Sequence, residues 1–168
     1  MIFLISYVLP AICGMFILLA DQLSKYYIVS NFNIGDSCGF LKGFIDIVYI
    51  HNRGGAWGIL EGNTWVLLSI TAVLLIVSLV LLIKFGKKSQ MFFWAVVLIF
   101  FGGIGNMIDR IFREGNVVDF LHFEFFPQFP VFNIADCAIV CGGILLILYF
   151  TVDTLKDIKS NKNNIDNE

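Results

Sequence analysis

Charged residues are scarce in this chain, and that scarcity limits the class of protein it can be. Asp, Glu, Lys and Arg make up 14% of the 168 residues, 58% are hydrophobic, and the mean hydropathy is +0.86. Soluble domains carry roughly a quarter of their residues as charged side chains. The chain also lacks a basic stripe for nucleic acid, and its length leaves no room for a separate soluble module. Composition predicts one small membrane domain.

Residues that ligate metals or form phosphate loops are few and unsuitably spaced. His51 and His122 lie far apart, and Cys137 and Cys141 have no second pair that would complete a zinc site. No serine stands in a nucleophile elbow, and the glycines at 102–105 open no βαβ unit. We therefore expect neither a metal site, nor a nucleotide-binding loop, nor a serine nucleophile.

What the chain does have is long runs without charge. Residues 1–20, 62–83 and 89–108 contain no charged side chain, and 125–152 contains only Asp136. A helix needs ~20 apolar residues to cross the hydrocarbon core. The first run has no basic start and no cleavage site, so it is expected to stay as a helix and not to be removed as a signal peptide. The predicted transmembrane helices cover about 4–27, 63–83, 90–110 and 133–154.

Lysines predict the orientation of these helices. They gather between the second and third runs, at 84–88, and after the fourth, at 156–162. Basic residues in short loops mark the cytoplasmic side, which places both termini inside. The expected architecture is an α-helical membrane protein with four transmembrane helices, forming one polytopic domain over 1–159. An outer β-region at about 32–60, an outer loop at about 113–132 and a disordered cytoplasmic tail at 160–168 complete it.

Carboxylates lie within or just after these apolar runs, although an ionisable group at membrane depth is costly and is functional by default. At 1.5 Å per residue, Asp109 lies ~30 Å from the start of its run and Asp136 ~24 Å from the inner end of its own. Asp21 reaches a similar height, and Asp119 follows the third run. In a core ~30 Å thick, these groups share one layer near the outer interface.

Two of the carboxylates have a cation close in sequence. Asp21 and Lys25 are four residues apart, so they face the same way on a helix and can pair. Asp109 is followed directly by Arg110. For both, a self-neutralising structural ion pair is the favoured interpretation over a role in chemistry.

Asp119 and Asp136 differ, because neither has a lysine or arginine within four positions. Two carboxyl groups that are desolvated and close together share one proton near neutrality. One can then act as a general base on water while the other acts as a general acid. The alternatives are a solvated interfacial aspartate, a helix N-cap at Asp136, or a proton relay in a small membrane transporter.

The segments between the runs differ in character. Residues 45–52 are strand-forming and precede a glycine-rich turn, which predicts a small β-structure within 32–60 that rests on the outer leaflet. Residues 120–132 are dense in aromatic side chains. That run is typical of an interfacial belt, and it also fits a rim that contacts a lipid-bearing substrate.

Five motif blocks occur in order along the chain. They are Asp21-Gln22-x-Ser24-Lys25, Asn52-Arg53-Gly54-Gly55-Ala56-Trp57-Gly58, Gly102-Gly103-x-Gly105-Asn106-x-x-Asp109-Arg110, Val117-Val118-Asp119-Phe120 and Phe132-Asn133-x-Ala135-Asp136. Together they resemble the bacterial lipoprotein signal peptidase family, also called signal peptidase II. The resemblance covers nearly the whole chain.

The resemblance implies a membrane aspartyl endopeptidase with Asp119 and Asp136 as its catalytic dyad. Its substrates would be diacylglyceryl-modified prolipoproteins, cut by an activated water just before the lipidated cysteine, without a cofactor. It further implies a monomer among the lipids of the bacterial cytoplasmic membrane, with its active site at the extracytoplasmic face. The residues expected to support the dyad and the substrate are Asp21, Lys25, Asn52, Arg53, Gly54, Asn106, Asp109, Arg110, Asn133 and Ala135.

Overall fold

The computed structural model describes residues 4–165, and four of its helices are long and apolar enough to cross a membrane. The prediction of four such helices and a small sheet is confirmed. In chain order the elements are η1 (Leu4–Val8), α1 (Leu9–Asn31), β1 (Ser37–Leu41), β2 (Ile45–Asn52), η2 (Ala56–Gly58), α2 (Thr64–Phe85), α3 (Gln90–Phe112), β3 (Val117–Phe123) and α4 (Ile134–Ile165).

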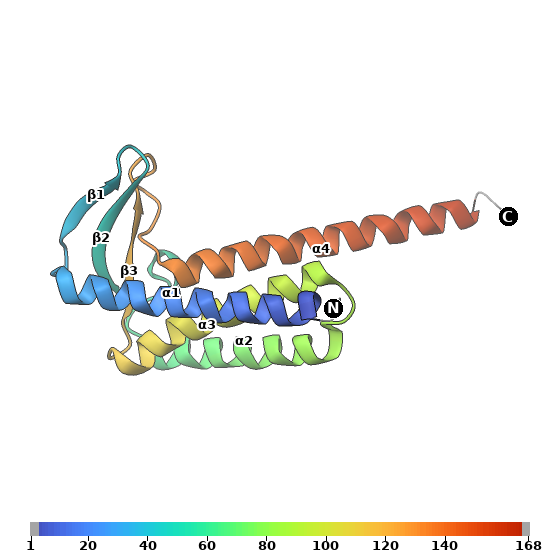
Figure 1. The fold of residues 1–168 in the computed structure, drawn as a ribbon, viewed down its shortest axis with the longest axis horizontal. Helices are drawn as coiled ribbons and strands as arrows, with labels where there is room; N and C mark the ends of the chain where they lie inside the picture. Colours follow the sequence, from blue (N-terminus) through green and yellow to red (C-terminus); the bar gives the residue numbers. More distant parts are fainter. Residues whose placement is uncertain (1–3, 166–168) are drawn as a thin grey trace.

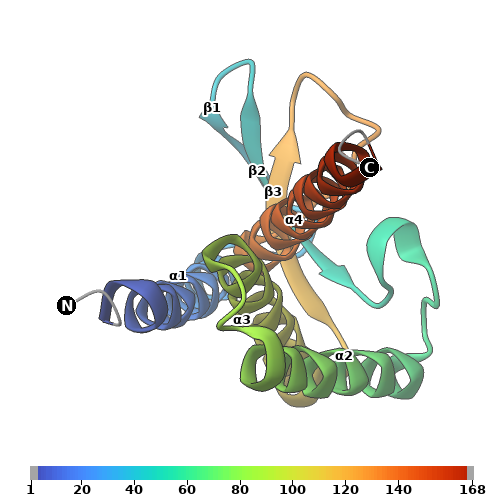
Figure 2. The same ribbon diagram turned by 90° about the vertical axis from the view of Figure 1, so that its right-hand side faces the viewer.

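Helix α3 is the centre of the bundle and contacts each of the other three long helices (Figure 2). Its glycines permit close approach. A Cβ on Gly102 would lie 2.6 Å from the carbonyl oxygen of Ala135 and 2.8 Å from Ile139. A Cβ on Gly105 would lie 2.7 Å from the carboxylate of Asp21 on α1. The C-terminal half of α3 therefore brings α1 and the start of α4 together.

The three strands form an antiparallel sheet in the order β1-β2-β3. The sheet stands at one end of the bundle and extends to one side, across the direction of the helices (Figure 1). It is anchored by a buried cluster of Tyr49 from β2, Val118 and Phe120 from β3, and Ile28 from α1. The α2–α3 turn lies at the opposite end, and α4 continues past it (Figure 1).

The third strand corrects the prediction of an outer loop over 113–132. β3 pairs with β2 so that Val118 lies opposite His51 and Asp119 opposite Ile50. The first four residues of β3 are all buried, on both faces. A strand buried on both faces shows no apolar–polar alternation, so the sequence pattern did not reveal it.

The ends of the first three spanning helices differ slightly from those predicted. The predicted helix at 4–27 consists of a π-helical turn, η1, followed by α1, which continues to Asn31. Pro10 lies in the first turn of α1, where its missing N–H costs nothing, and this favours a new helix start there. Helices α2 and α3 begin and end within two residues of the predicted limits.

The fourth helix is much longer than the predicted 133–154. α4 continues to Ile165, so the expectation of a disordered tail at 160–168 is wrong for its helical part, and the remaining residues lie outside the described chain. Hydropathy falls after Val152, but no glycine or proline follows Gly143. A helix already nucleated in the spanning segment propagates through such a sequence.

Candidate active site

Buried polar side chains gather where the sheet meets the helical bundle. Sites this rich in buried charge are unusual, because each group must find a partner. The group draws on α1, α3, β3 and the residues around them. Its members, each at most 9% exposed, are Asp21, Lys25, Asn106, Asp109, Arg110, Asn116, Asp119 and Asn133. With Asp136, Gln22 and Arg113, which bond to members of this group, they form what we call the polar layer.

Lys25 is the centre of a buried ion-pair cluster. Its Nζ lies 2.9 Å from Oδ2 of Asp21, one turn earlier on α1, and 3.0 Å from Oδ2 of Asp109 on α3. It also donates to Oδ1 of Asn106 at 3.1 Å. All three ammonium protons are thus matched by acceptors. The predicted Asp21–Lys25 pair is present, and a second carboxylate shares its cation.

Asp109 does not pair with Arg110, which corrects the expectation from sequence. Its Oδ1 lies 3.2 Å from Nε of Arg113, and its Oδ2 accepts from the backbone N–H of Val118 at 3.1 Å. Adjacent helical residues do not face each other, whereas Arg113 lies one turn further on the same side. Asp109 therefore joins α1, α3 and β3 through one carboxylate.

Asn106 connects the Lys25 cluster to Asp136. Its Oδ1 accepts from Lys25, so its Nδ2 faces the other way and donates to Oδ1 of Asp136 at 2.7 Å. An ammonium group can only donate, which fixes the orientation of the amide. Lys25 thereby determines that a donor, and not an acceptor, faces Asp136.

Asn133 and Asp136 cap the start of α4 reciprocally. Oδ1 of Asn133 accepts from the backbone N–H of Asp136 at 2.9 Å, and Oδ2 of Asp136 accepts from the N–H of Asn133 at 3.2 Å. The N-cap is therefore Asn133, whereas Asp136 is the third helical residue and not the N-cap that the sequence suggested. Its part in this capping box does not exclude chemistry. The next free N–H, that of Ala135, donates to Oδ1 of Asp21 at 2.9 Å. The first turn of α4 is thus fixed to α1.

Asp119 is held entirely by amide groups. Asn133 Nδ2 donates to its Oδ1 at 2.6 Å, and Asn52 Nδ2 donates to its Oδ2 at 2.8 Å. The Asn52 amide is oriented by the N–H of Gly54, which donates to its Oδ1 at 2.8 Å. Since Asn133 also caps α4, this one side chain contacts both Asp119 and the residue Asp136. Neither carboxylate has a Lys, Arg or His nitrogen within 4.0 Å among the described residues.

Arg110 faces the loop that follows β2. Its Nη2 donates to the carbonyl oxygen of Gly54 at 2.9 Å, while its Nε is buried without a hydrogen-bond partner among the residues that the structure describes. Arg53 in the same loop donates from Nε to Oδ1 of Asn116 at 3.1 Å. The loop is thus fastened to the polar layer on both sides.

Three members of the polar layer were not predicted from the sequence. Gln22 donates to Oδ2 of Asp21 at 3.0 Å and to the carbonyl of Gly105 at 3.1 Å. Arg113 pairs with Asp109, and Asn116 joins Arg53. The four-residue spacing from Asp109 to Arg113 was a visible signal, whereas nothing in the sequence indicates the contact of Asn116.

Comparisons with known proteins bear on this arrangement. The family model described as signal peptidase (SPase) II matches residues 13–152, which include all of the polar layer. The chain belongs to the signal peptidase II family. Its relatives include lipoprotein signal peptidases of Bacillus pumilus (strain SAFR-032) and Enterococcus faecalis (strain ATCC 700802 / V583). The first is 43% identical over 83% of this chain and 90% of the relative. The second is 40% identical over 85% of this chain and 87% of the relative.

Solved structures agree with this membership. A bacterial membrane enzyme determined in meso at 2.3 Å resolution has a TM-score of 0.81 and 38% identity, over 88% of each chain. A second, at 1.9 Å resolution, has a TM-score of 0.75 and 37% identity, over 86% of this chain and 91% of the other. The signal peptidase II family is one of aspartic peptidases.

In this member of the signal peptidase II family, Asp119 titrates far from its ordinary range. Burial, followed by the negative charge of Asp136, raises the pKa of Asp119 from 3.8 to about 7. Hydrogen bonds from Asn52 and Asn133 act in the opposite direction but do not cancel the rise. Burial costs the carboxylate its water, and amide donors without a full charge compensate only partly. Asp119 therefore holds a proton near neutral pH.

The polar layer does not continue through the bundle. Toward the α2–α3 turn, the buried side chains of α3 are apolar: Phe92, Ala95, Val96 and Val97. Ser78 on α2 is the one buried polar side chain in that half among the described residues. A proton relay across a membrane needs a chain of polar groups, so this arrangement does not favour the transporter alternative.

Proposed function

We propose that this protein is the lipoprotein signal peptidase of its cell and that Asp119 and Asp136 are its catalytic residues. The observation that carries this proposal is the contact of Asn133 with both residues, neither of which has a Lys, Arg or His nitrogen within 4.0 Å in the described part of the chain. Carboxylates that serve as scaffold are compensated, as Asp21 and Asp109 are by Lys25. The uncompensated pair is free to exchange a proton with a substrate and water.

The reaction follows from one proton shared by two carboxyl groups. Asp136, half-buried and therefore more accessible, is the base that takes a proton from water as its oxygen attacks the scissile carbonyl. Asp119, protonated near neutrality, gives its proton to the carbonyl oxygen and stabilises the tetrahedral intermediate. The amide C–N bond then breaks as the proton held by Asp136 passes to the leaving amine, and Asp119 recovers its proton from a hydroxyl of the intermediate as the carbonyl re-forms. The products are a free carboxylate on the signal peptide and a new N-terminus.

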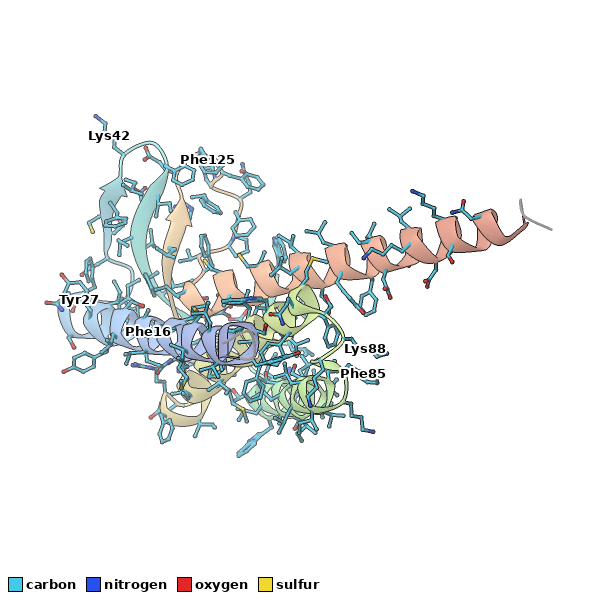
Figure 3. The ribbon with its side chains drawn as sticks, turned by 45° about the vertical axis from the view of Figure 1, so that its right-hand side comes forward. Phe16, Tyr27, Lys42, Phe85, Lys88 and Phe125 are labelled. Atoms are coloured by element: carbon cyan, nitrogen blue, oxygen red, sulfur yellow. The ribbon has the colours of Figure 1, made fainter. Side chains whose placement is uncertain are left out.

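The depth of the dyad fits a scissile bond at a membrane surface. Asp136 is in the first turn of α4, and Asp119 is on β3 outside the spanning helices. Lysines mark the other end of the bundle: Lys88 lies at the α2–α3 turn, far from the sheet (Figure 3). Under the positive-inside rule, the sheet and dyad face the extracytoplasmic side, and both termini are cytoplasmic.

The other polar residues position this machinery. Asn106 and Asn133 orient the dyad, and Asn52 orients Asp119 from the sheet side. Arg110 holds the loop after β2 in place through the carbonyl of Gly54. The remaining supporting residues act through these groups and the backbone, namely Asp21, Lys25, Arg53, Gly54, Asp109 and Ala135.

The test is cleavage of a prolipoprotein by purified protein in lipid vesicles. The diacylglyceryl precursor is expected to be cut just before its lipidated cysteine. A Cys→Ser precursor, which cannot be acylated, should remain intact because it lacks two acyl chains, worth ~0.8 kcal/mol per buried methylene, that hold the bond at the depth of the dyad. Equal cleavage of both precursors would overturn lipid-dependent recognition but leave aspartyl chemistry standing. No cleavage of either precursor would overturn the proposal.

A further inference from the structure

The α2–α3 turn and α4 enclose a groove at the end of the bundle remote from the sheet. No residue of this groove belongs to the polar layer described above. Figure 3 places Lys88 and Phe85 at this end, and Lys42 and Phe125 in the turns at the tip of the sheet. The groove has a volume of about 180 Å³ and is lined by Lys88, Ser89, Met91, Tyr149, Val152, Asp153 and Lys156.

We propose that this groove binds the phosphate headgroup of an anionic phospholipid between Lys88 and Lys156. The height of the groove fits a headgroup. Lys88 and Ser89 connect two spanning helices, α2 and α3, and so lie at the membrane surface. On α4, Lys156 lies ~33 Å from Ile134 at 1.5 Å per residue, close to the ~30 Å thickness of the hydrocarbon core.

The lining has the two-sided character of a phospholipid. Met91, Val152 and the ring of Tyr149 supply an apolar side. The Tyr149 ring is fixed by contacts with Phe92 and Phe150, at 5.3 and 5.2 Å between ring centroids. Tyrosine is typical of the interface between acyl chains and headgroups. A diacyl lipid can therefore leave its glycerol at this side while its chains follow the apolar surface of the bundle.

The polar side of the groove has hydrogen-bond donors that are available to a ligand. Lys88 and Lys156 are both exposed, and neither lies within 4.0 Å of a carboxylate oxygen among the described residues. Ser89 Oγ accepts from the N–H of Phe92 at 3.5 Å, which leaves its hydroxyl proton available to a phosphate. Asp153 is the one acidic residue of the lining, so the lining carries a net charge of +1 from two lysines and one aspartate.

Net positive charge selects an anion over a zwitterionic lipid. A phosphatidylcholine brings its own cation, which Lys88 and Lys156 would repel, whereas phosphatidylglycerol brings only the phosphate charge. Lysines beside a membrane gain from each anionic lipid that they contact. The ligand class is therefore a phospholipid with one net negative charge and a small headgroup.

The test uses the full chain in a neutral detergent and counts bound lipids by native mass spectrometry. Phosphatidylglycerol, phosphatidylcholine and inorganic phosphate are titrated separately. Three proteins are compared: the wild type, a K88Q/K156Q variant, and a K87Q/K159Q variant. The last removes the same charge from the same turn and the same helix but outside the groove lining. Thermal unfolding of each protein checks that the fold is kept.

We expect the wild type to bind one phosphatidylglycerol more tightly than phosphatidylcholine. K88Q/K156Q should weaken that binding by roughly ten- to thirty-fold, the effect of two lysine contacts, and K87Q/K159Q by no more than about two-fold. Equal losses in the two variants would overturn the site in favour of general surface charge. Equal binding of the two lipids by the wild type would overturn its anion selectivity. Binding of inorganic phosphate as tight as that of phosphatidylglycerol would assign the groove to free phosphate instead of lipid.

Discussion

The two carboxylate pairs of the polar layer are held in opposite ways. Asp21 and Asp109 share the ammonium group of Lys25, and Asp109 also pairs with Arg113. Within residues 4–165, Asp119 and Asp136 receive only amide and backbone N–H donors. The ammonium group of Lys25 compensates the charge of the first pair, whereas amide donors carry no full charge and leave that of the second pair uncompensated. The first pair is suited to hold the fold, and the second to move a proton.

The largest effect of a substitution is expected at the uncompensated pair, Asp119 and Asp136. D119N and D136N keep the size of each side chain and remove its ionisable proton. We expect each to lower the rate of precursor cleavage by at least about a hundred-fold, the lower end for general acid–base groups, while thermal stability is kept. The matched control is D157N on the exposed part of α4, which should cleave normally. Near-normal turnover by D119N or D136N would remove the aspartyl mechanism.

At the first pair, the expected loss is in folding. K25M leaves Asp21 and Asp109 buried without their shared cation, and a buried pair that loses one partner is destabilised by ~3–5 kcal/mol. D109N is milder, because Lys25 keeps Asp21 at 2.9 Å. We expect thermal unfolding to show a large decrease for K25M and a smaller one for D109N, with activity lowered but not abolished in D109N. A stable D109N protein without any activity would assign Asp109 to the chemistry.

A third prediction concerns the close packing that brings the two pairs together. In G102A the new methyl group would lie 2.6 Å from the carbonyl of Ala135 and 2.8 Å from Ile139, so α4 must move away. We expect a loss of roughly 1–3 kcal/mol and a fall in activity, since Asp136 moves with α4. G143A on α4 is the control, because its Cβ would meet nothing within 4 Å. If G102A unfolds at the same temperature as G143A, the contact between α3 and α4 is looser than described.

The smallest expected effect is on the pH profile. With the pKa of Asp119 at about 7, cleavage should fall as the pH rises through that value and the acid loses its proton. N52A removes a hydrogen bond that lowers this pKa, so the alkaline limb should move to higher pH by a fraction of a unit. A shift to lower pH would show that Asn52 acts on the profile through another group.

The same pKa has a consequence for stability. The native state holds a proton on Asp119 between pH 3.8 and about 7 that the unfolded chain releases. Stability therefore decreases as the pH rises through this window. Denaturant unfolding should show this slope in the wild type and a weaker one in D119N. An unchanged slope in D119N would mean that another group holds the proton.

Much of this arrangement was readable from the sequence. Uncharged runs predict the helices because the hydrocarbon core tolerates little charge, and carboxylates inside those runs predict the polar layer for the same reason. The absence of lysine or arginine near Asp119 and Asp136 separated them from Asp21 and Asp109. That separation matches the way the structure holds each pair.

What the sequence could not supply are contacts between distant segments. Lys25 pairs with Asp109, although 84 positions separate them in the sequence. The predicted pairing of Asp109 with Arg110 was wrong, because the side chains of adjacent residues on a helix point in different directions. β3 was not predicted, because a strand that is buried on both faces lacks the apolar–polar alternation by which strands are recognised. Asn116 and Gln22 are ordinary polar residues whose roles depend on packing alone.

The hydrogen bond from Ala135 to Asp21 joins positions 114 residues apart, so it can form only late in the synthesis of the chain. Asn133, Ala135 and Asp136 all belong to the start of the last helix. A ribosome has therefore made three helices and the entire sheet before the residues that complete the dyad emerge. On the proposed function, the nascent chain cannot hydrolyse peptides until α4 has been made. A chain ending at residue 132 is accordingly expected to insert its first helices and to cleave nothing.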